Sequence, residues 1–230
     1  MFTIESIQKV VKAINTAKAE YMGKDVADIK LAISKGNRKI GRTMNVSLPP
    51  IVTCANCKEC KFLCYDIKAC LQYPNTVIDS RVRNLVILLK DREEYFDRID
   101  KAISRRKTNK FFRWHVAGDI VDIEYFDNMV RIARRHPDFI FWTYTKNYKV
   151  VNEWIRIHGG SKKSLPKNLS VMFSEWRGME MINPYGLPEF RVVFKGEEKP
   201  AGHYCPGNCD ICLKSGRGCV AGETTYCNEH

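Results

Sequence analysis

Apolar residues near the start of the chain recur at helical spacing. They lie three or four positions apart in residues 4–14 and again in residues 26–33, which predicts two amphipathic helices. Gly36 is expected to end the second helix, because glycine often follows the last helical residue. We therefore expect a helical N-terminal segment over residues 1–40.

Beyond this segment the pattern alternates between strands and helices. Strands are expected at residues 43–48, 111–116, 139–144, 169–173 and 190–194, and helices near residues 82–89, 123–135 and 150–158, with residues 95–103 either continuing or following the first of these helices. Such an alternation is typical of right-handed parallel βαβ units whose sheet is covered on both faces. Residues 176–189 carry glycines and prolines without a helical period, so a loop is expected to join the last two strands.

The predicted architecture is an α/β fold with three parts. The N-terminal helices over residues 1–40 precede a partial parallel βα barrel of about five to six strands over residues 41–199. A cysteine loop at residues 54–70 interrupts this barrel after its first strand. Residues 200–230 form a cysteine-rich, turn-rich C-terminal tail, which we expect to be ordered by metal ligands rather than by an apolar core.

Composition places the chain among proteins that can build a full core. Its 230 residues are 44% hydrophobic, so neither disulfides nor metal are needed for compactness. The first residues show no apolar signal region, and no stretch approaches the roughly 18 apolar residues of a membrane span. We therefore expect a cytoplasmic location without a membrane partner, where reducing conditions keep thiols free to bind metal.

The formal net charge is +12, from 38 basic and 26 acidic residues. A basic surface favours polyanionic partners, so nucleic acid or a nucleotide is the expected partner class. The alternative is that the charge only keeps the protein soluble.

The first cysteine group has the spacing of an iron–sulfur motif. Cys54, Cys57, Cys60 and Cys64 follow the pattern C-x2-C-x2-C-x3-C, which bacterial ferredoxins use to bind 4Fe-4S clusters. Zinc sites more often use two separated C-x2-C pairs. We therefore expect an iron–sulfur cluster, with zinc as the alternative metal and unligated or redox-active thiols as a third interpretation.

The second cysteine group lies in the tail. It offers five cysteines for a site that needs four ligands, and His203 and His230 are alternative ligands. We expect a structural or auxiliary metal cluster there, or a zinc knuckle. The predicted ligands are Cys205, Cys209, Cys212, Cys219 and Cys227.

Polar residues follow each predicted strand. Strand parity places Arg113 and His115 on the inward face of the 111–116 strand, and its end carries Gly118 and Asp119. The next two strands end in polar residues as well. Ligands collect at the carboxyl ends of parallel strands, which predicts a polar, mainly basic cleft beside the first cysteine group. Its predicted lining residues are His115, Gly118, Asp119, Lys146, Ser174 and Glu175.

Several of these segments resemble the phage gene product eighty-eight family, which occurs in phages, mobile elements and gut bacteria. The resemblance is carried by the cysteine loop and tail and by WHVAGD at residues 114–119, FWTYTK at residues 141–146 and MFSEW at residues 172–176. The order of these segments is also similar to that in distant relatives of radical S-adenosylmethionine enzymes. That similarity implies a bound S-adenosylmethionine, with Gly118 and Asp119 at the amino group of its methionine.

Two functions follow as expectations. The first is an iron–sulfur protein with a radical S-adenosylmethionine-like fold, acting as an enzyme on a small or nucleotide substrate. The alternative is a non-enzymatic protein that uses metal to hold its structure together and binds nucleic acid or a host protein complex through its basic surface.

Overall fold

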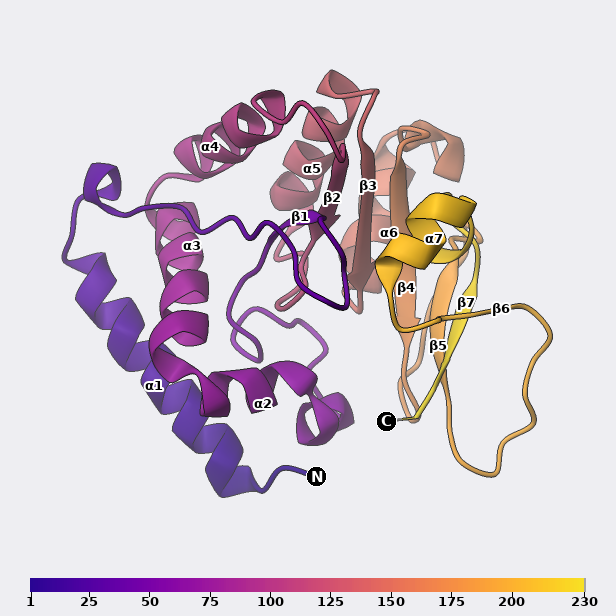
Figure 1. Ribbon diagram of the computed structural model, residues 1–230, viewed down its shortest axis with the longest axis horizontal. Helices are drawn as coiled ribbons and strands as arrows, with labels where there is room; N and C mark the ends of the chain where they lie inside the picture. The colour runs from indigo at the N-terminus through magenta and orange to yellow at the C-terminus, as the bar shows by residue number, and fades with distance from the viewer. Residues whose placement is uncertain (230) are drawn as a thin grey trace.

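A single sheet of seven parallel strands organises the computed structural model, which describes residues 1–229. The strands lie in the order β1-β2-β3-β4-β5-β7-β6 (Figure 1). Their bounds are β1 Met44–Val46, β2 Phe111–Trp114, β3 Ile140–Thr145, β4 Leu169–Glu175, β5 Glu189–Val193, β6 His203–Tyr204 and β7 Thr225–Asn228. The predicted parallel α/β fold is confirmed, and the count exceeds the expected five to six because the tail contributes β6 and β7.

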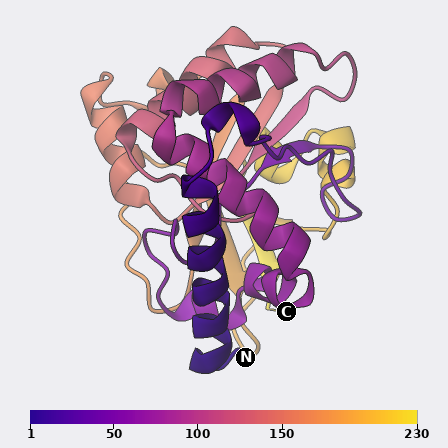
Figure 2. The same ribbon diagram turned by 90° about the vertical axis from the view of Figure 1, so that its left-hand side faces the viewer.

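The helices that precede the tail cover one face of this sheet, which we call the outer face. Helix α1 packs along the outside of α3 (Figure 2). As predicted, no helix lies between β4 and β5. The helices are α1 Ile4–Met22, α2 Tyr65–Gln72, α3 Asp79–Lys90, α4 Arg92–Ser104, α5 Ile123–Arg135, α6 Tyr148–Ile157 and α7 Cys209–Ser215.

Strand alternation separates two cores. On the outer face, Phe112, Trp114 and Phe141 join the apolar residues of the helices in the main core. On the opposite face, which we call the inner face, Trp142 and Met172 pack against Cys219 of the tail. Both faces are therefore covered, as a parallel sheet requires.

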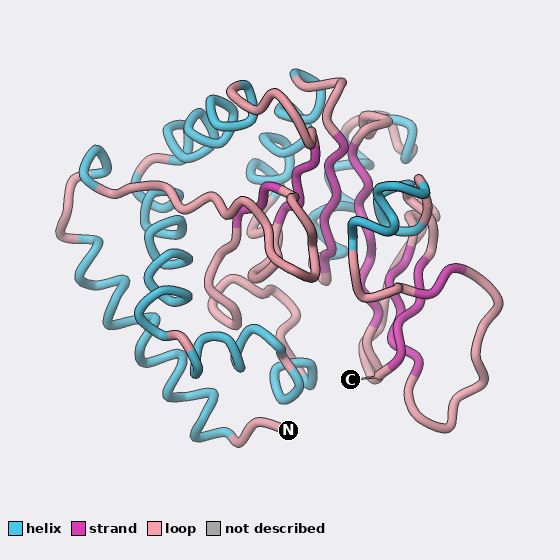
Figure 3. The backbone as a smooth tube through the Cα atoms, viewed as in Figure 1, coloured by secondary structure: helices cyan, strands magenta, loops and turns pink. Residues whose placement is uncertain are grey.

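The tail covers the inner face. The turn Gly218–Ala221 contacts β3 and β4, and the backbone N–H of Cys209 donates to the carbonyl of Lys39, 2.9 Å away, near the β1 edge. Figure 3 shows that much of this region, like residues 47–58, is loop. The tail therefore reaches from β7 to the far side of the inner face.

The predicted second N-terminal helix is wrong. Residues Val26–Asp28 form one 3-10 turn, and the chain then runs extended towards β1. Arg98 donates to the carbonyls of Val26 and Ile29, and the Asn84 side chain bonds to both the N–H and the carbonyl of Ala32. These bonds satisfy backbone groups that a helix would otherwise pair internally, so tertiary contacts override the helical spacing.

A buried carboxylate joins the carboxyl ends of β2 and β3. Asp119 is 4% exposed. Its Oδ1 accepts from the Thr145 hydroxyl at 2.6 Å and from the Ile120 N–H at 2.7 Å, while its Oδ2 accepts from the Lys146 N–H at 2.9 Å. Burial raises the pKa of this carboxyl, and the three donors oppose that rise. The carboxylate thus fixes the backbone where the site is built.

Replacing Asp119 by Asn is expected to destabilise the protein. The amide would present N–H donors where Oδ2 now accepts from Lys146, and that backbone donor would lose its acceptor. An unsatisfied buried donor costs about 1–3 kcal/mol, which lowers the Tm of a chain of this size by roughly 2–10 °C. Thermal unfolding followed by circular dichroism measures the shift.

Asp138→Asn is the matched control, because Asp138 is exposed and pairs with Lys110 at the surface. Its Tm should stay at the wild-type value. Equal shifts in the two variants, or no shift in Asp119→Asn, would contradict the bridging role of Asp119.

Candidate functional site

The cysteine loop lies against the carboxyl end of β2 because of a close backbone approach at Gly118. A Cβ at this position would lie 2.7 Å from both Leu48 Cβ and Thr53 Oγ1, and the φ of Gly118 is +80°. The Leu48 N–H also donates to the Ala117 carbonyl at 3.0 Å. Glycine alone fits this contact without strain, so Gly118 sets the position of the residues that lead into the cysteines.

A second contact ties the cysteine loop to β3. The side-chain amide of Asn56 donates to the carbonyl of Lys146, which directly follows the β3 strand. Asn56 lies between Cys54 and Cys57. The loop therefore spans the ends of β2 and β3, and its thiols lie beside both.

The first four thiols differ in their surroundings. The neighbouring thiols of Cys54 and Cys60 raise the pKa of Cys57, and burial adds to the rise. A hydrogen bond from Cys57 lowers the pKa of Cys60 to about 6, and the Lys146 ammonium adds to this effect against the opposing effect of burial. Burial raises the pKa of Cys64, at the start of α2, to about 11. Cys60 is thus the thiol best prepared to bind metal as a thiolate.

Polar groups from β4 and α6 complete this edge of the sheet. The Lys146 ammonium donates to the Ser174 hydroxyl at 3.1 Å, and the Tyr148 hydroxyl donates to the Ser174 carbonyl. Tyr148 is also in electrostatic range of Cys60 and Asp119. Three of the predicted cleft residues, Asp119, Lys146 and Ser174, therefore lie together beside the first cysteines.

The position of His115 differs from the parity prediction, which is wrong for this residue. His115 follows the last residue of β2 with a positive φ of 54°, so regular alternation ends before it. Its ring contacts the Tyr125 hydroxyl at 2.9 Å and Thr143 at 3.3 Å in the buried outer core. Burial lowers the pKa of His115 to about 3, with the Arg113 charge adding to the effect. His115 is therefore a neutral core residue at neutral pH.

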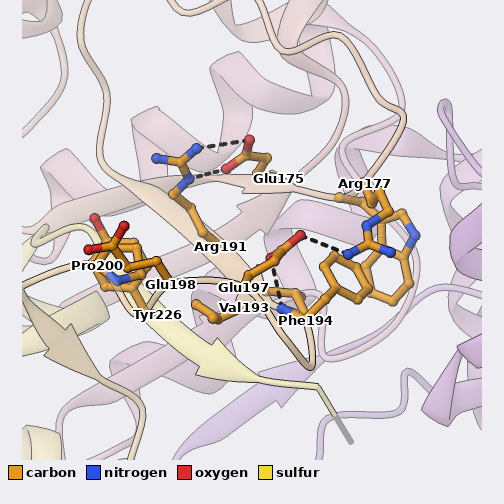
Figure 4. Close-up of a pocket in the computed structure, with 11 residues that line it drawn as sticks. Glu175, Arg177, Arg191, Val193, Phe194, Glu197, Glu198, Pro200 and Tyr226 are labelled. Atoms are coloured by element: carbon orange, nitrogen blue, oxygen red, sulfur yellow. Dashed lines mark hydrogen bonds and ion pairs between the residues drawn. The ribbon is translucent and has the colours of Figure 1, made fainter.

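Glu175 lines a separate pocket of about 240 Å³ at the ends of β4 and β5 (Figure 4). Its carboxylate is ion-paired with Arg191, and Arg177 pairs with Glu197 at 2.7 Å on the same pocket wall. These charges are satisfied within the protein. Glu175 thus faces Arg191 rather than the group formed by Lys146 and Ser174.

The five tail cysteines gather under the inner face. The charge of Cys205 acts on the pKa of each of the other four, and Thr225 and Tyr144 oppose the effect of burial on the pKa of Cys219. Burial raises the pKa of Cys212 and Cys227 to about 11. His203 Nε2 lies 3.6 Å from the Cys212 sulfur, whereas His230 lies outside the described residues.

Within residues 1–229, no three His, Cys, Asp or Glu side chains are gathered at positions that would hold one metal ion. Support for metal binding therefore comes from the residue types, their spacing and their neighbours. In the same part of the chain, no helix is long and apolar enough to cross a membrane.

Sequence reasoning missed two contributors to this edge of the sheet. The sequence pattern around Asn56 did not indicate its role, because that role depends on the Lys146 carbonyl, 90 residues away. Tyr148 begins a helix whose apolar pattern alone placed its start at residue 150, two residues later than observed. Periodicity reports burial, and Tyr148 is buried, but it does not report which backbone carbonyl a hydroxyl reaches.

Comparison with known proteins identifies the family. The family model described as Gene product 88 matches residues 24–201, well over half of the chain. No curated protein and no solved structure matches this chain. The matched range contains the cysteine loop, strands β1 to β5 and the residues that meet at their carboxyl ends. The chain therefore belongs to the gene product 88 family.

Proposed function

We propose that this protein is an iron–sulfur protein whose first cluster lies over the carboxyl ends of β2 and β3 and whose neighbouring polar groups bind a small anionic or nucleotide ligand. S-adenosylmethionine is the first candidate ligand. The tail cysteines are proposed to hold a second metal centre with a structural role.

One observation carries this proposal. The contact at Gly118 and the Asn56 hydrogen bond hold four closely spaced thiols at the strand ends, where α/β proteins bind ligands. Thiols at this spacing are the residue type that iron–sulfur clusters use, and Cys54, Cys57 and Cys60 act on one another's pKa values. We assign these three as the cluster ligands, because their thiols act on one another, whereas burial is the main cause of the raised pKa of Cys64 at the start of α2.

The chain's own groups would orient and bind the ligand. Lys146 offers a positive charge beside Cys60, and its position is fixed by the Ser174 hydroxyl. Carboxylate and phosphate groups are the anions that such an ammonium binds. When bound, a cluster with one open iron supplies an electron and a coordination position to the ligand beside it.

Anaerobically purified protein is expected to be brown. Thiolate-to-iron charge transfer gives broad absorbance at about 400 nm, and iron and sulfide should be present at about four per occupied cluster. Cys57→Ser should lose the iron of the first cluster, because Cys57 contacts both neighbouring thiols. Cys70→Ser is the control, since Cys70 is buried beside Arg81 instead. A colourless protein holding stoichiometric zinc would refute the iron–sulfur assignment.

Cys64→Ser tests whether one iron of the first cluster lacks a cysteine ligand. We expect this variant to retain its iron and to change its electron paramagnetic resonance spectrum when S-adenosylmethionine is added, as the wild type does. Loss of iron equal to that of Cys57→Ser would mean four protein ligands and no open iron. Two results together would favour the non-enzymatic alternative. The first is a cluster spectrum that does not change when S-adenosylmethionine is added. The second is binding of single-stranded DNA that weakens steeply as the salt concentration rises.

Metal removal should release the tail before the rest of the chain. Helix α7 has seven residues and buries only Cys212, and the turn Gly218–Ala221 buries only Gly218 and Cys219. So little apolar burial leaves order dependent on bound metal. After chelation, trypsin is expected to cut first after Lys214 or Arg217, as read by mass spectrometry. Unchanged protection would show that β7 pairing and packing suffice without metal.

A further inference from the structure

Two basic segments meet at the amino edge of the sheet, the edge opposite the first cysteine group. The chain has 26 acidic residues, yet residues 29–58 and 101–118 contain none, and each range carries six Lys or Arg residues. The first range contains β1 and the second contains β2. These strands pair in parallel, with Met44 opposite Phe112. The basic residues that precede the two strands are therefore brought to one edge.

A direct contact joins the two segments. The Arg106 guanidinium, in the loop before β2, donates through Nη2 to the carbonyl of Arg42 at 3.3 Å. The turn before β1 has a defined shape, because the Asn37 side chain accepts from the N–H groups of Lys39 and Ile40 at 2.8 and 3.1 Å. The basic side chains are thus carried by an ordered backbone rather than by a flexible arm.

Five cations at this edge are exposed, and within residues 1–229 none of the five makes an ion pair. The neighbouring carboxylates of Asp138 and Asp100 are already paired, with Lys110 and with Arg135. We call the five cations the basic edge: Arg38, Lys39, Arg42, Arg105 and Lys107.

The tail contributes one carboxylate to the basic edge. The turn at residues 37–41 lies beside α7 (Figure 2), where the Cys209 N–H donates to the Lys39 carbonyl. Asp210 in α7 fills the space that a side chain on Gly41 would take, since a Cβ there would lie 1.7 Å from Asp210 Oδ1. This carboxylate offsets one of the five charges, so the basic edge keeps a net positive charge.

The residue types at this edge are those that contact phosphate. Proteins bind nucleic-acid phosphates through Arg and Lys and through the hydroxyl and amide groups of Ser, Thr and Asn. The same two segments expose Ser34, Asn37, Ser104 and Thr108. Residues 34–42 and 101–110 contain no aromatic residue, whereas proteins that bind single strands stack bases on aromatic rings. The chemistry therefore fits a duplex, whose bases are already stacked inside and whose phosphates lie outside.

We propose that the basic edge binds the phosphate backbone of a nucleic-acid duplex without reading its sequence. A duplex carries one negative charge per roughly 1.7 Å of its axis, so it can engage several of the five cations at once. The surface is separate from the proposed ligand site, because Lys146 and Asn56 meet at the carboxyl ends of the strands. The inference does not depend on either proposed metal centre.

An anionic membrane surface is the rival partner. Proteins that lie on membranes combine cations with exposed apolar side chains that enter the lipid. None of the exposed large apolar side chains of residues 1–229 lies in residues 34–42 or 101–110. The basic edge offers charge and hydrogen bonds alone, which favours the duplex.

Binding to a duplex should weaken with salt in proportion to the cations engaged. Contact with about five phosphates gives a slope of about −4.5 in a plot of log K against log salt concentration. Arg42→Gln/Lys107→Gln removes one cation from each segment, so the slope should become less steep by about 1.8, and binding at about 0.1 M salt should weaken by about 10- to 100-fold. Both side chains are exposed among like charges. Their removal should leave the Tm at the wild-type value or raise it slightly.

The experiment follows fluorescence anisotropy of labelled nucleic acid with the full-length protein over a range of salt concentrations. A DNA duplex, an RNA duplex of the same sequence and the single DNA strand are compared, and the tighter of the two duplexes identifies the partner. Lys9→Gln/Lys12→Gln is the matched control, because it removes the same charge from exposed residues of α1 and should bind as the wild type does. Cys57→Ser should also bind the duplex like the wild type, even where it loses iron, so this proposal can be judged apart from the metal centres.

Three results would overturn the proposal. Equal weakening in the two double variants would assign binding to the net charge of the protein rather than to the basic edge. Tighter binding of the single strand than of either duplex would exclude a duplex partner. Binding to phosphatidylserine vesicles without binding to either duplex would identify a membrane surface instead.

Discussion

The buried Asp119 carboxylate is the interaction on which the rest of the site depends. Parallel strands bring their carboxyl ends to one edge of a sheet, but hydrogen bonding between strands stops where the strands end. Asp119 extends the connection by accepting from Thr145 and from the backbone of Lys146. The carbonyl of Lys146 can then accept a hydrogen bond from the Asn56 side chain, and the Lys146 ammonium can donate to the Ser174 hydroxyl. This carboxylate thereby positions the basic group and, together with the close approach at Gly118, the cysteine loop.

The two faces of the sheet differ in the groups that they carry. The outer face is an aromatic and aliphatic core in which even His115 is neutral and fully engaged. The inner face carries the cation of Arg113, the Tyr144 hydroxyl and the thiols of the tail. The tail covers the apolar part of this face, where Cys219 packs against Trp142 and Met172.

Local patterns predicted the parts of the fold that depend on local burial. The helix at residues 123–135 was predicted with the bounds that α5 has, because a strong amphipathic period and the Asp122 cap act within a few residues. The same reasoning failed for residues 26–33, where Arg98 and Asn84 pair with the backbone from distant helices. It also failed for His115, since a positive φ turned the ring to the outer face. Of the predicted cleft residues, Asp119, Lys146 and Ser174 came together at one edge because the strands are parallel, whereas Glu175 at the end of β4 pairs with Arg191 instead.

The tail is part of the sheet rather than an appendage to it. The family match ends at residue 201, yet Trp142 and Met172 inside the matched range pack against Cys219 beyond it, and β7 extends the sheet from β5. Uncovered, these two buried side chains would face water, at a cost of roughly 1.5–3 kcal/mol for a side chain of the size of Met172. The inner face of a parallel sheet must be covered. The tail meets this need with four short elements, and pairing of β7 with β5 anchors them to the sheet.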